Sequence, residues 1–287
     1  MSSKIPKVLS IQSHVAYSYA GNKAAVFPMQ KLGIEVSPIY TVQLSNHTQY
    51  DFYKGSLFSA EDIQNVINGM IVNGFLAQQN AILSGYIGNL EIAKVIANTV
   101  VELKKLNSNS LYCCDPVFGD KYDEDENGHI FASADHPNIF LSHLLPLSDI
   151  ITPNLFELSI LSDFQIGNYN DIITACKKLI SKTGNHNEVI IITSVSFSND
   201  KTGIAIYQHD NFSYLESPKY KVQSKVSGSG DITAAMFLSY LLKGKGLEET
   251  LKAVTQCLDG LFRVTKELNT DELALIQAQE YINNGSL

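Results

Sequence analysis

The chain lacks the features that covalently cross-link a protein or anchor it in a membrane. It has only four cysteines, without a CxxC pair or a nearby histidine pair at ligand spacing: Cys113, Cys114, Cys176 and Cys257. A zinc site is therefore not expected, and reduced, mostly buried thiols are favoured over a redox role. No apolar run is long enough to span a bilayer, and residues 1–7 are followed by a run too short and too polar for a signal-peptide core. We expect a cytoplasmic protein.

Positive charge is also scarce. The 21 Lys and Arg residues are outnumbered by 29 Asp and Glu residues, which gives a net charge of −8 and a pI of about 5.3. Nucleic acids and anionic membranes would repel such a surface, so small-molecule chemistry is favoured. With 45% hydrophobic and 17% charged residues, the chain can bury one large core. We expect a single domain over residues 1–287.

Short apolar or β-branched runs alternate with longer helical patterns, which predicts an α/β fold with a mainly parallel central sheet and helices on both faces. Strands are expected at residues 8–12, 34–42, 81–84, 110–114, 150–152, 189–193, 203–207 and 212–215. Helices are expected at residues 22–32, 60–74, 90–106, 155–161, 169–182, 231–242, 247–266 and 271–282. The last two strands read as a hairpin, so an antiparallel pair is expected at one sheet edge.

A glycine-rich turn precedes the apolar helix expected at residues 231–242. Gly228 and Gly230 leave the backbone N–H groups at the helix start uncrowded, which suits a phosphate or the charge that develops on one. Asp231 follows at once, where a carboxylate could accept a hydroxyl proton during attack on phosphorus. The alternative is an ordinary loop with Asp231 as the helix N-cap. The turn has neither the Gly-Lys-Ser/Thr of a Walker A loop nor the three glycines of a Rossmann fingerprint.

Two carboxylates follow the strand expected at residues 110–114. Asp115 lies at the carboxyl edge of the sheet, where ligands of open α/β sheets bind, and Asp120 is close enough to share a cation-rich phosphate site. The alternative for Asp-Pro is a simple turn. The long irregular segment 119–138 is typical of a lid or a disordered excursion, and its acidic residues 123–126 are favoured as a solvated loop.

Two further strands are expected to end in polar residues at this same edge. Thr152, Asn154 and Glu157 could supply oxygen ligands for Mg²⁺-bound phosphates, although a capping box formed by Asn154 and Glu157 is a competing interpretation. Thr193 and Ser194 close an apolar buried strand, where such residues more often only form a turn.

Three polar clusters follow strands expected in the amino-terminal part, and they offer hydroxyls, amides, imidazoles and the Tyr86 ring. Such groups suit a flat, neutral, heteroaromatic substrate. For His14 and His47 a hydrogen-bonded structural role is favoured. For Ser13 and Thr48 substrate contact is favoured, on the strength of the family resemblance.

Seven motifs in order, from about residue 8 to about residue 240, resemble pyridoxal kinase, within the ribokinase superfamily. They are Ile11-Gln-Ser-His, Tyr19-Ala-Gly-Asn-Lys-Ala-Ala, Leu44-Ser-Asn-His-Thr, Ser84-Gly-Tyr, Cys114-Asp-Pro-Val-Phe-Gly-Asp-Lys, Ile151-Thr-Pro-Asn-Leu-Phe-Glu and Gly228-Ser-Gly-Asp. The resemblance implies a ribokinase-like fold, a homodimer, and transfer of the ATP γ-phosphate to the 5′-hydroxymethyl group of pyridoxal, with pyridoxine and pyridoxamine as further substrates.

The resemblance also implies roles for individual residues. Asp231 matches the catalytic base, and the anion hole matches Gly228, Ser229 and Gly230. Ser13 would meet the pyridine nitrogen, Thr48 the phenolic oxygen side of the ring, and Tyr86 the ring's surroundings. Positions that contact ATP or its ions match Asp115, Asn154, Glu157, Thr193 and Ser194, with Asp120 at the start of a phosphate-covering lid.

The family uses Mg²⁺ with ATP and often K⁺. The metal ligands implied here are Asp115, Thr152, Glu157 and Thr193. Two positions depart from the family pattern, because Ser229 stands where Thr is frequent and Phe118 where Met or Leu is commoner. The first change keeps a hydroxyl, and the second reshapes an apolar wall.

Other functions compete with this one. A hydroxymethylpyrimidine kinase phosphorylates a similar group on a flat ring, although the Ser45-Asn-His-Thr48 cluster favours pyridoxal. A weakly active carrier of pyridoxal phosphate is a second alternative, and a purely structural protein on this fold a third. The presence of Asp231 and both glycines favours an active enzyme.

Overall fold

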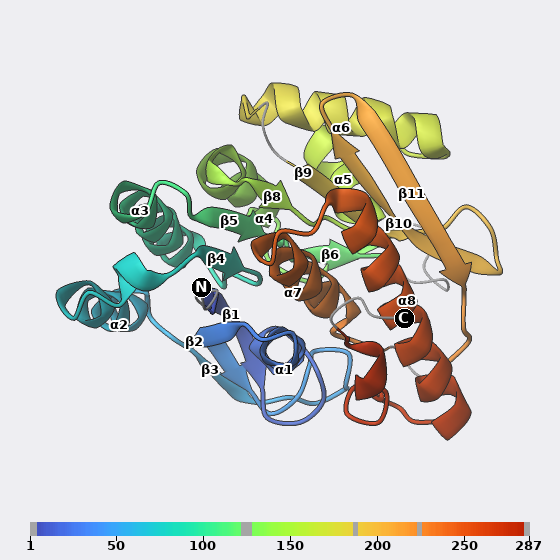
Figure 1. Ribbon diagram of the computed structural model, residues 1–287, viewed down its shortest axis with the longest axis horizontal. Coiled ribbons are helices and arrows are strands. Elements are labelled where there is room, and N and C mark those ends of the chain that lie inside the picture. The colour runs from blue at the N-terminus through green and yellow to red at the C-terminus, as the bar shows by residue number, and fades with distance from the viewer. Residues whose placement is uncertain (1–4, 122–127, 186–188, 223–225, 284–287) are drawn as a thin grey trace.

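The computed structural model describes residues 5–121, 128–185, 189–222 and 226–283. Within them, nine strands form one sheet in the order β11-β10-β9-β8-β5-β4-β1-β2-β3 (Figure 1). The strands are β1 (Lys7–Val15), β2 (Glu35–Leu44), β3 (Gly55–Leu57), β4 (Ala81–Ser84), β5 (Leu111–Cys114), β8 (Ile150–Ile151), β9 (Val189–Val195), β10 (Lys201–Gln208) and β11 (Asn211–Pro218).

The centre of this sheet is parallel. The neighbours from β2 through β1, β4, β5 and β8 to β9 all pair in parallel, whereas β10, β11 and β3 pair antiparallel at the two sides. The predicted mainly parallel sheet with an antiparallel edge hairpin is therefore confirmed. The short strand β3 adds an antiparallel neighbour at the opposite edge, which the sequence pattern did not predict.

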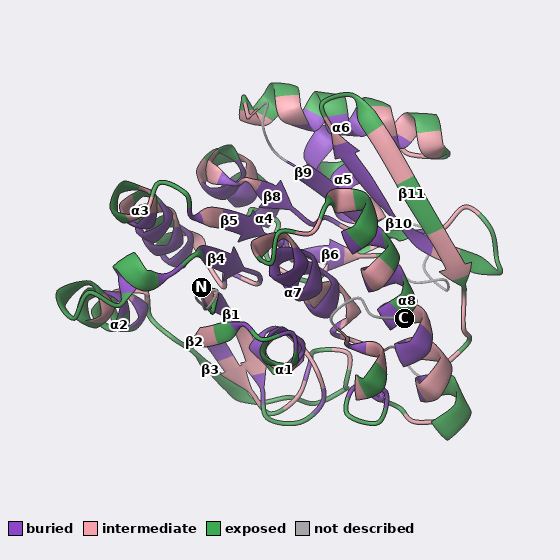
Figure 2. Ribbon diagram, in the orientation of Figure 1, coloured by how far each residue is buried: buried purple, intermediate pink, exposed green. Residues whose placement is uncertain are grey.

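Helices cover both faces of the sheet. They are α1 (Asn22–Lys31), α2 (Ala60–Val72), α3 (Leu90–Leu106), α4 (His136–Ile139), α5 (Leu155–Ser162), α6 (Tyr169–Thr183), α7 (Ser229–Leu242) and α8 (Leu247–Leu268). Buried side chains of α2, α3, α5 and α6 pack on one face, and those of α1, α7 and α8 on the other. In β9, Ile190 and Ile192 enter the first core while Val189 and Ile191 enter the second. Burial on both faces explains why this strand is continuously apolar (Figure 2).

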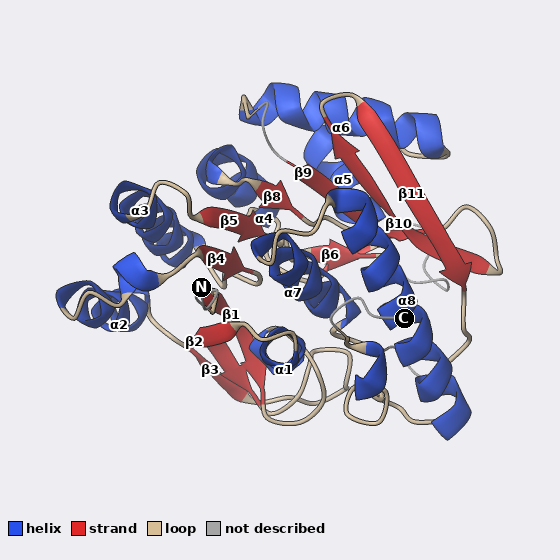
Figure 3. Cartoon of the chain, in the orientation of Figure 1, coloured by secondary structure: helices blue, strands red, loops and turns tan. Residues whose placement is uncertain are grey.

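The helix predicted at residues 271–282 is wrong. The helix α8 ends at Leu268, and its C-cap Asn269 has a left-handed φ of 52°. The chain then forms turns and one 3₁₀ helix, η4 (Gln279–Tyr281), as Figure 3 shows. Three consecutive residues, Leu273 to Leu275, are all buried. A helix would turn at least one of them towards solvent, whereas an irregular segment buries all three.

The segment predicted to be irregular, residues 119–138, contains a two-stranded ribbon. Strand β6 (Gly119–Asp120) pairs antiparallel with β7 (His129–Ile130), and the acidic residues 123–126 lie outside the described residues. A Cβ atom at Gly119 or Gly128 would come within 2.6 Å of the Phe156 ring. The ribbon can therefore pack against the first turn of α5 only because both positions are glycine.

Helical turns without a counterpart in the sequence prediction complete the described chain. They are η1 (Leu76–Gln78), the π-helical turn η2 (Phe140–Leu144) and η3 (Leu145–Leu147). All four cysteines are buried and outside any disulfide, which confirms the expected buried thiols. In the described parts of the chain, no helix combines the length and the apolar character that crossing a bilayer requires.

Candidate functional site

Polar residues gather where the parallel strands end. The register pairs Ser84 of β4 with Cys114 of β5, and Cys114 with Ile151 of β8, which in turn pairs with Ile190 of β9. Residues just beyond these pairs therefore lie along one carboxyl edge of the sheet, and they include Asp115, Thr152, Thr193 and Ser194. The structure thus brings together the strand-end residues that the sequence singled out.

Asp115 lies buried at this edge. The Thr152 hydroxyl donates a 2.8 Å hydrogen bond to its Oδ1. Burial and the nearby charge of Asp231 raise the pKa of Asp115 to about 8, against the weaker opposing effect of Thr152. Asp115 therefore lies close enough to Asp231 for the charge of one carboxylate to disfavour ionisation of the other.

Asp231 is the third residue of α7. The N-cap of this helix is Gly228, with φ of 91°, and no side chain caps it, so the alternative of Asp231 as N-cap is wrong. The helix also begins at Ser229, two residues earlier than predicted. Ser229, Gly230 and Asp231 thus contribute the first N–H groups of α7, which have no partner within a helix.

Asp231 is partly exposed as a residue, but protein surrounds its carboxylate. Burial raises its pKa to about 6, while the N–H groups of Gly21 and of Asp231 itself donate to the carboxylate and lower it. At neutral pH Asp231 is therefore mostly ionised, whereas Asp115 mostly retains its proton. Different pKa values for neighbouring carboxyl groups are typical of acid and base sites.

Close backbone packing fixes Asp231. Gly21, with φ of 54°, is the N-cap of α1, and a Cβ there would collide with the carbonyl oxygen and hydroxyl of Ser13. A Cβ at Gly228 would lie 2.8 Å from the carbonyl oxygen of Tyr19. The starts of α1 and α7 and the end of β1 therefore meet here, which places Ser13 beside the glycine that binds Asp231. Gly21 lies in the Tyr19-Ala-Gly-Asn-Lys-Ala-Ala motif, but no role was predicted for it from the sequence.

Asn154 and Glu157 form the capping box that competed with a ligand role. Asn154 Oδ1 accepts from the Glu157 N–H at 2.8 Å, and Glu157 Oε2 accepts from the Asn154 N–H at 2.9 Å. The remaining polar atoms hold β6 and the residue before it. Asn154 Nδ2 donates to the Gly119 carbonyl at 2.8 Å, and Glu157 Oε1 accepts from the N–H groups of Phe118 (3.0 Å) and Gly119 (3.4 Å). Burial and Asp115 raise the pKa of Glu157.

The remaining oxygens suit a cation that arrives with a phosphate. No group of three or more His, Cys, Asp or Glu side chains is arranged to hold a metal ion among the described residues. Thr152 and Glu157 are engaged within the protein, which leaves the carboxylates of Asp115 and Asp231. A cation beside these two groups would ease their ionisation. Mg²⁺ is usually bound by one or two carboxylates of the protein together with phosphates of the substrate.

A pocket of about 190 Å³ opens beside the glycine turn. Thr193 and Ser194 from β9 line it together with Ser229 and Gly230 from α7. The rest of its wall was not predicted from the sequence. It comes from β10, from the end of β11 and the residues after it, and from α8, and it includes Gly203, Pro218, Tyr220, Leu258 and Phe262.

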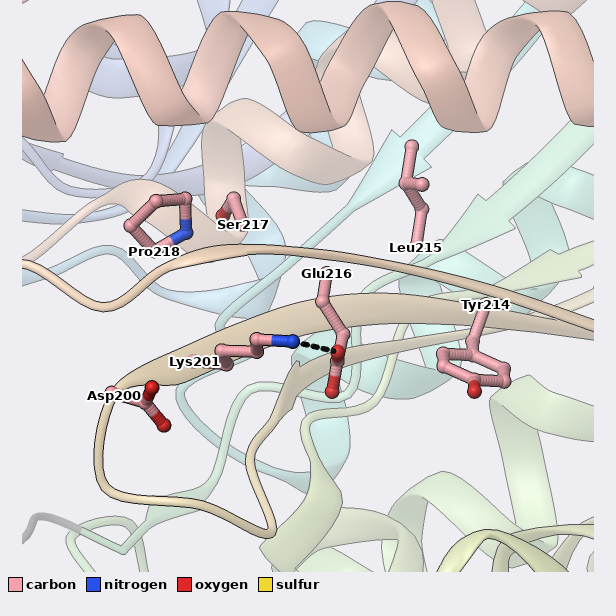
Figure 4. Close-up of a pocket in the computed structure, with 7 residues that line it drawn as sticks. All are labelled: Asp200, Lys201, Tyr214, Leu215, Glu216, Ser217 and Pro218. Carbon is pink, nitrogen blue, oxygen red and sulfur yellow. Dashed lines mark hydrogen bonds and ion pairs between the residues drawn. The ribbon is translucent and has the colours of Figure 1, made fainter.

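A second hollow lies on the open edge of the sheet, beside β11. Figure 4 shows Lys201 and Glu216 paired across it, at 3.3 Å, with the Tyr214 ring at one end. Its wall includes no strand end of the parallel sheet. Buried catalytic groups are absent from its lining, so we place the functional site at the carboxyl edge.

The polar clusters of the amino-terminal part flank the carboxyl edge. Thr48 is exposed on the loop after β2, and the half-buried Tyr86 ring stacks on His136 with 5.8 Å between ring centroids. The hydrogen-bonded role favoured for His47 is confirmed by its contact with Glu272. For His14 it is not, because its ring stacks on Tyr40 and its buried Nδ1 lacks a partner among the described residues.

Asp120 is the second residue of β6 in the ribbon beside this edge. Its Oδ1 accepts from the Lys121 N–H at 2.8 Å, and burial raises the pKa of its carboxyl group. Glu157 experiences the charge of both Asp115 and Asp120. The acidic residues picked from the sequence are therefore neighbours in space.

Comparison with known proteins adds independent information. Residues 55–274 match the family model described as phosphomethylpyrimidine kinase. The chain is 38% identical over 275 residues to the pyridoxal kinase PdxY of Actinobacillus pleuropneumoniae, covering 96% of this chain and 94% of that protein. It is 36% identical to the pyridoxal kinase PdxY of Vibrio parahaemolyticus, covering 95% and 92%.

Solved structures of pyridoxal kinases are also similar to this chain. The pyridoxal kinase from Leishmania donovani in complex with ADP and pyridoxine has a TM-score of 0.86 and 28% identity, covering 98% of this chain and 96% of that one. A putative phosphomethylpyrimidine kinase from Bacteroides thetaiotaomicron shares the fold, with a TM-score of 0.84 at 23% identity and coverage of 97% and 94%.

Proposed function

The chain belongs to the pyridoxal kinase family of the ribokinase superfamily, and we propose that it transfers the γ-phosphate of ATP to the 5′-hydroxymethyl group of pyridoxal. The predicted family and fold are confirmed by these relatives. The product is pyridoxal 5′-phosphate. Pyridoxine and pyridoxamine carry the same hydroxymethyl group and are further substrates in this proposal.

One observation carries the proposal above the others. Asp231, ionised at neutral pH, lies in the first turn of α7, directly beside N–H groups that have no helical partner. As the substrate oxygen attacks phosphorus, its proton passes to the Asp231 carboxylate. The backbone of Gly228, Ser229 and Gly230, at the positive end of the helix dipole, stabilises the negative charge on the transferring group.

The nucleotide occupies the pocket beside this turn. Because Ser229 and Gly230 line it together with Thr193 and Ser194, a nucleotide held there directs its phosphates towards the start of α7. Asp115 and Asp120 face the phosphates from the opposite side. Asn154 and Glu157 affect nucleotide binding indirectly, because their side chains hydrogen-bond the backbone of Gly119, the first residue of the ribbon.

Asp115 is the protein ligand we assign to Mg²⁺, which neutralises phosphate charge when bound. Its Oδ1 accepts a hydrogen bond from the Thr152 hydroxyl. K⁺, with Thr152 and Thr193 as further ligands, remains a prediction.

The substrate ring lies between the amino-terminal clusters. Ser13 contacts the pyridine nitrogen, Thr48 the phenolic oxygen side and Tyr86 the ring's surroundings. Ser13 packs on Gly21, whose N–H donates to Asp231, so ring placement and base placement depend on the same piece of backbone. A single kinase domain over residues 1–287, a homodimer and a cytoplasmic location complete the proposal, and sedimentation of the purified protein tests the dimer.

The test is ATP-dependent formation of pyridoxal phosphate by the purified protein, followed by absorbance with Mg²⁺ and K⁺ present. Hydroxymethylpyrimidine is the parallel substrate, because the matched family model is described by that chemistry. We expect faster turnover of pyridoxal. Faster turnover of the pyrimidine would reassign the enzyme to that reaction, and absence of turnover with tight binding of pyridoxal phosphate would indicate a carrier.

A further inference from the structure

One carboxylate from the end of the chain reaches the loop that carries Thr48. Glu272 Oε1 lies 3.2 Å from His47 Nε2 and 2.5 Å from the Tyr50 hydroxyl. The side chains of His47 and Glu272 are 7% and 13% exposed, so this contact is shielded from water. The residues are more than 220 positions apart in the sequence.

The direction of these hydrogen bonds is determined by the loop itself. The Gln49 N–H donates to His47 Nδ1 at 3.3 Å, so Nδ1 is an acceptor and the proton of a neutral imidazole is on Nε2. His47 Nε2–H and the Tyr50 hydroxyl therefore both donate to Glu272. The contact raises the pKa of Tyr50, as expected for a hydroxyl that donates to a carboxylate. Bonds to an ionised acceptor are about twice as strong as neutral ones.

The rest of the loop is held separately. Its two ends are joined by the Ser45 N–H donating to the Lys54 carbonyl at 2.7 Å, and Asn46 Nδ2 bonds the Phe52 carbonyl at 3.0 Å. No such bond within the loop involves the Thr48 side chain, which is exposed. Thr48 lies between His47 and Tyr50, and Glu272 fixes both of these neighbours.

Glu272 is itself firmly placed. The Thr270 hydroxyl donates to the Glu272 carbonyl at 2.8 Å, and the Ala274 N–H donates to Thr265 Oγ1 at 3.0 Å, which ties the segment to α8. Its second oxygen, Oε2, is buried and has no hydrogen-bond partner among the described residues. A buried acceptor without a partner costs stability, so stability alone does not account for a carboxylate at this position.

We propose that Glu272 is a positioning residue that, through His47 and Tyr50, holds Thr48 in place for the pyridoxal ring. This inference rests on the proposed function, because it assigns Thr48 to the substrate. Glu272 itself touches neither substrate nor ATP. Its removal loosens the loop, and the substrate must then fix Thr48 as it binds.

The test compares Glu272→Ala and Glu272→Gln with a matched control, Glu280→Gln, an exposed glutamate of the same segment. We expect Glu272→Ala to raise KM for pyridoxal on the order of tenfold, since it deletes two charge-assisted hydrogen bonds. Glu272→Gln keeps an acceptor but not the charge and should give a smaller increase. KM for ATP, kcat and the control should change by less than about twofold, within the range of surface substitutions.

A double-mutant cycle separates positioning from general stability. If Glu272 acts through Thr48, adding Glu272→Ala to Thr48→Ala raises KM for pyridoxal little beyond the effect of Thr48→Ala alone. Additive effects, an unchanged KM in Glu272→Ala, or a loss of kcat alone would overturn the inference, as would a Thr48→Ala variant with wild-type KM.

Turnover by the wild type separates a failure of the proposed function from a failure of the positioning role. Without turnover by the wild type, the proposed function fails first, and titration calorimetry with pyridoxal then makes the same comparison through Kd. Equal affinity of the wild type and Glu272→Ala in that titration would overturn the positioning role. Should Glu272→Ala fail to fold, Glu272→Gln and Tyr50→Phe carry the cycle, because both retain the side-chain volume.

Discussion

The neighbouring carboxyl groups of Asp115 and Asp231 have different pKa values in the site. Asp115, buried and near Asp231, has its pKa raised to about 8, whereas N–H donors limit the rise for Asp231 to about 6. Only the second group is ready to accept a proton at neutral pH. This difference favours Asp231 over Asp115 as the base of the proposed reaction.

Replacing this base tests the assignment directly. Asp231→Asn should lower kcat on the order of a hundredfold to ten-thousandfold, the range for a positioned general base, and leave KM for ATP nearly unchanged. The rate of pyridoxal phosphate formation, measured at varied ATP concentration, gives both kcat and KM. Turnover near that of the wild type would remove the base role, and loss of ATP binding would make Asp231 a metal ligand or a structural residue.

The pH dependence of the reaction follows from the same group. Since the base must be ionised and its pKa lies at about 6, kcat/KM should fall as pH drops below about 6. The decrease should approach tenfold per pH unit for a single titrating group. In Asp231→Asn this acid limb should disappear from the residual activity, and its persistence there would assign the titration to another group.

Asp115 should affect stability rather than the acid limb. Its folded pKa is raised from 3.8 to about 8, so its contribution is fully present below 3.8 and is lost as pH rises through about 8. Without Mg²⁺, the wild type should therefore lose thermal stability between pH 6 and pH 9 more steeply than Asp115→Asn. Thermal unfolding across that range measures the difference, and parallel curves would contradict it.

At the scale of elements, the site depends on how closely α7 and α1 begin. Gly228→Ala places a methyl group 2.8 Å from the Tyr19 carbonyl oxygen and 3.1 Å from the Ala24 Cβ, at a φ of 91°. Gly244 has a similar φ of 81° but open space around it. The two glycines form a matched pair that separates backbone strain from collision.

We expect Gly244→Ala to cost about 1 kcal/mol of unfolding free energy through backbone strain, and Gly228→Ala to cost more, about 2–3 kcal/mol. Gly228→Ala should also lower kcat, because it shifts the first turn of α7 away from the phosphate. Denaturant unfolding and the kinase assay measure both. Equal effects of the two substitutions would exclude a role for close packing at the start of α7.

The elements also show what a sequence pattern can and cannot predict. The apolar runs of β4, β5 and β9 and the repeating faces of α3 and α8 were read correctly, because burial on one or two faces leaves a clear period. The segment after α8 was misread as a helix. Its apolar spacing is helical in part, but the tertiary contacts of residues 273–275 decided its conformation.

The site shows the same division. Residues at strand ends, such as Asp115 and Thr152, were predictable because a parallel sheet aligns its carboxyl ends. A ligand role was predicted for Asn154 and Glu157. Their i, i+3 spacing also fits a capping box, and the structure shows that capping box. Gly21 and Glu272 were missed, since contacts between distant segments leave no periodic signal.

On the scale of the whole molecule, the site draws on both ends of the chain. Gly21 near one end binds Asp231 on α7, and Glu272 near the other end binds the loop after β2. The parallel sheet between them brings these regions together. No single contiguous segment contains the complete site.

This arrangement has a consequence for any dissection of the protein. A fragment that ends before α7 would lack the turn of Gly228 and Asp231, and a fragment that ends before Glu272 would lack the contact with His47. Neither fragment would contain every residue that we assign to the site.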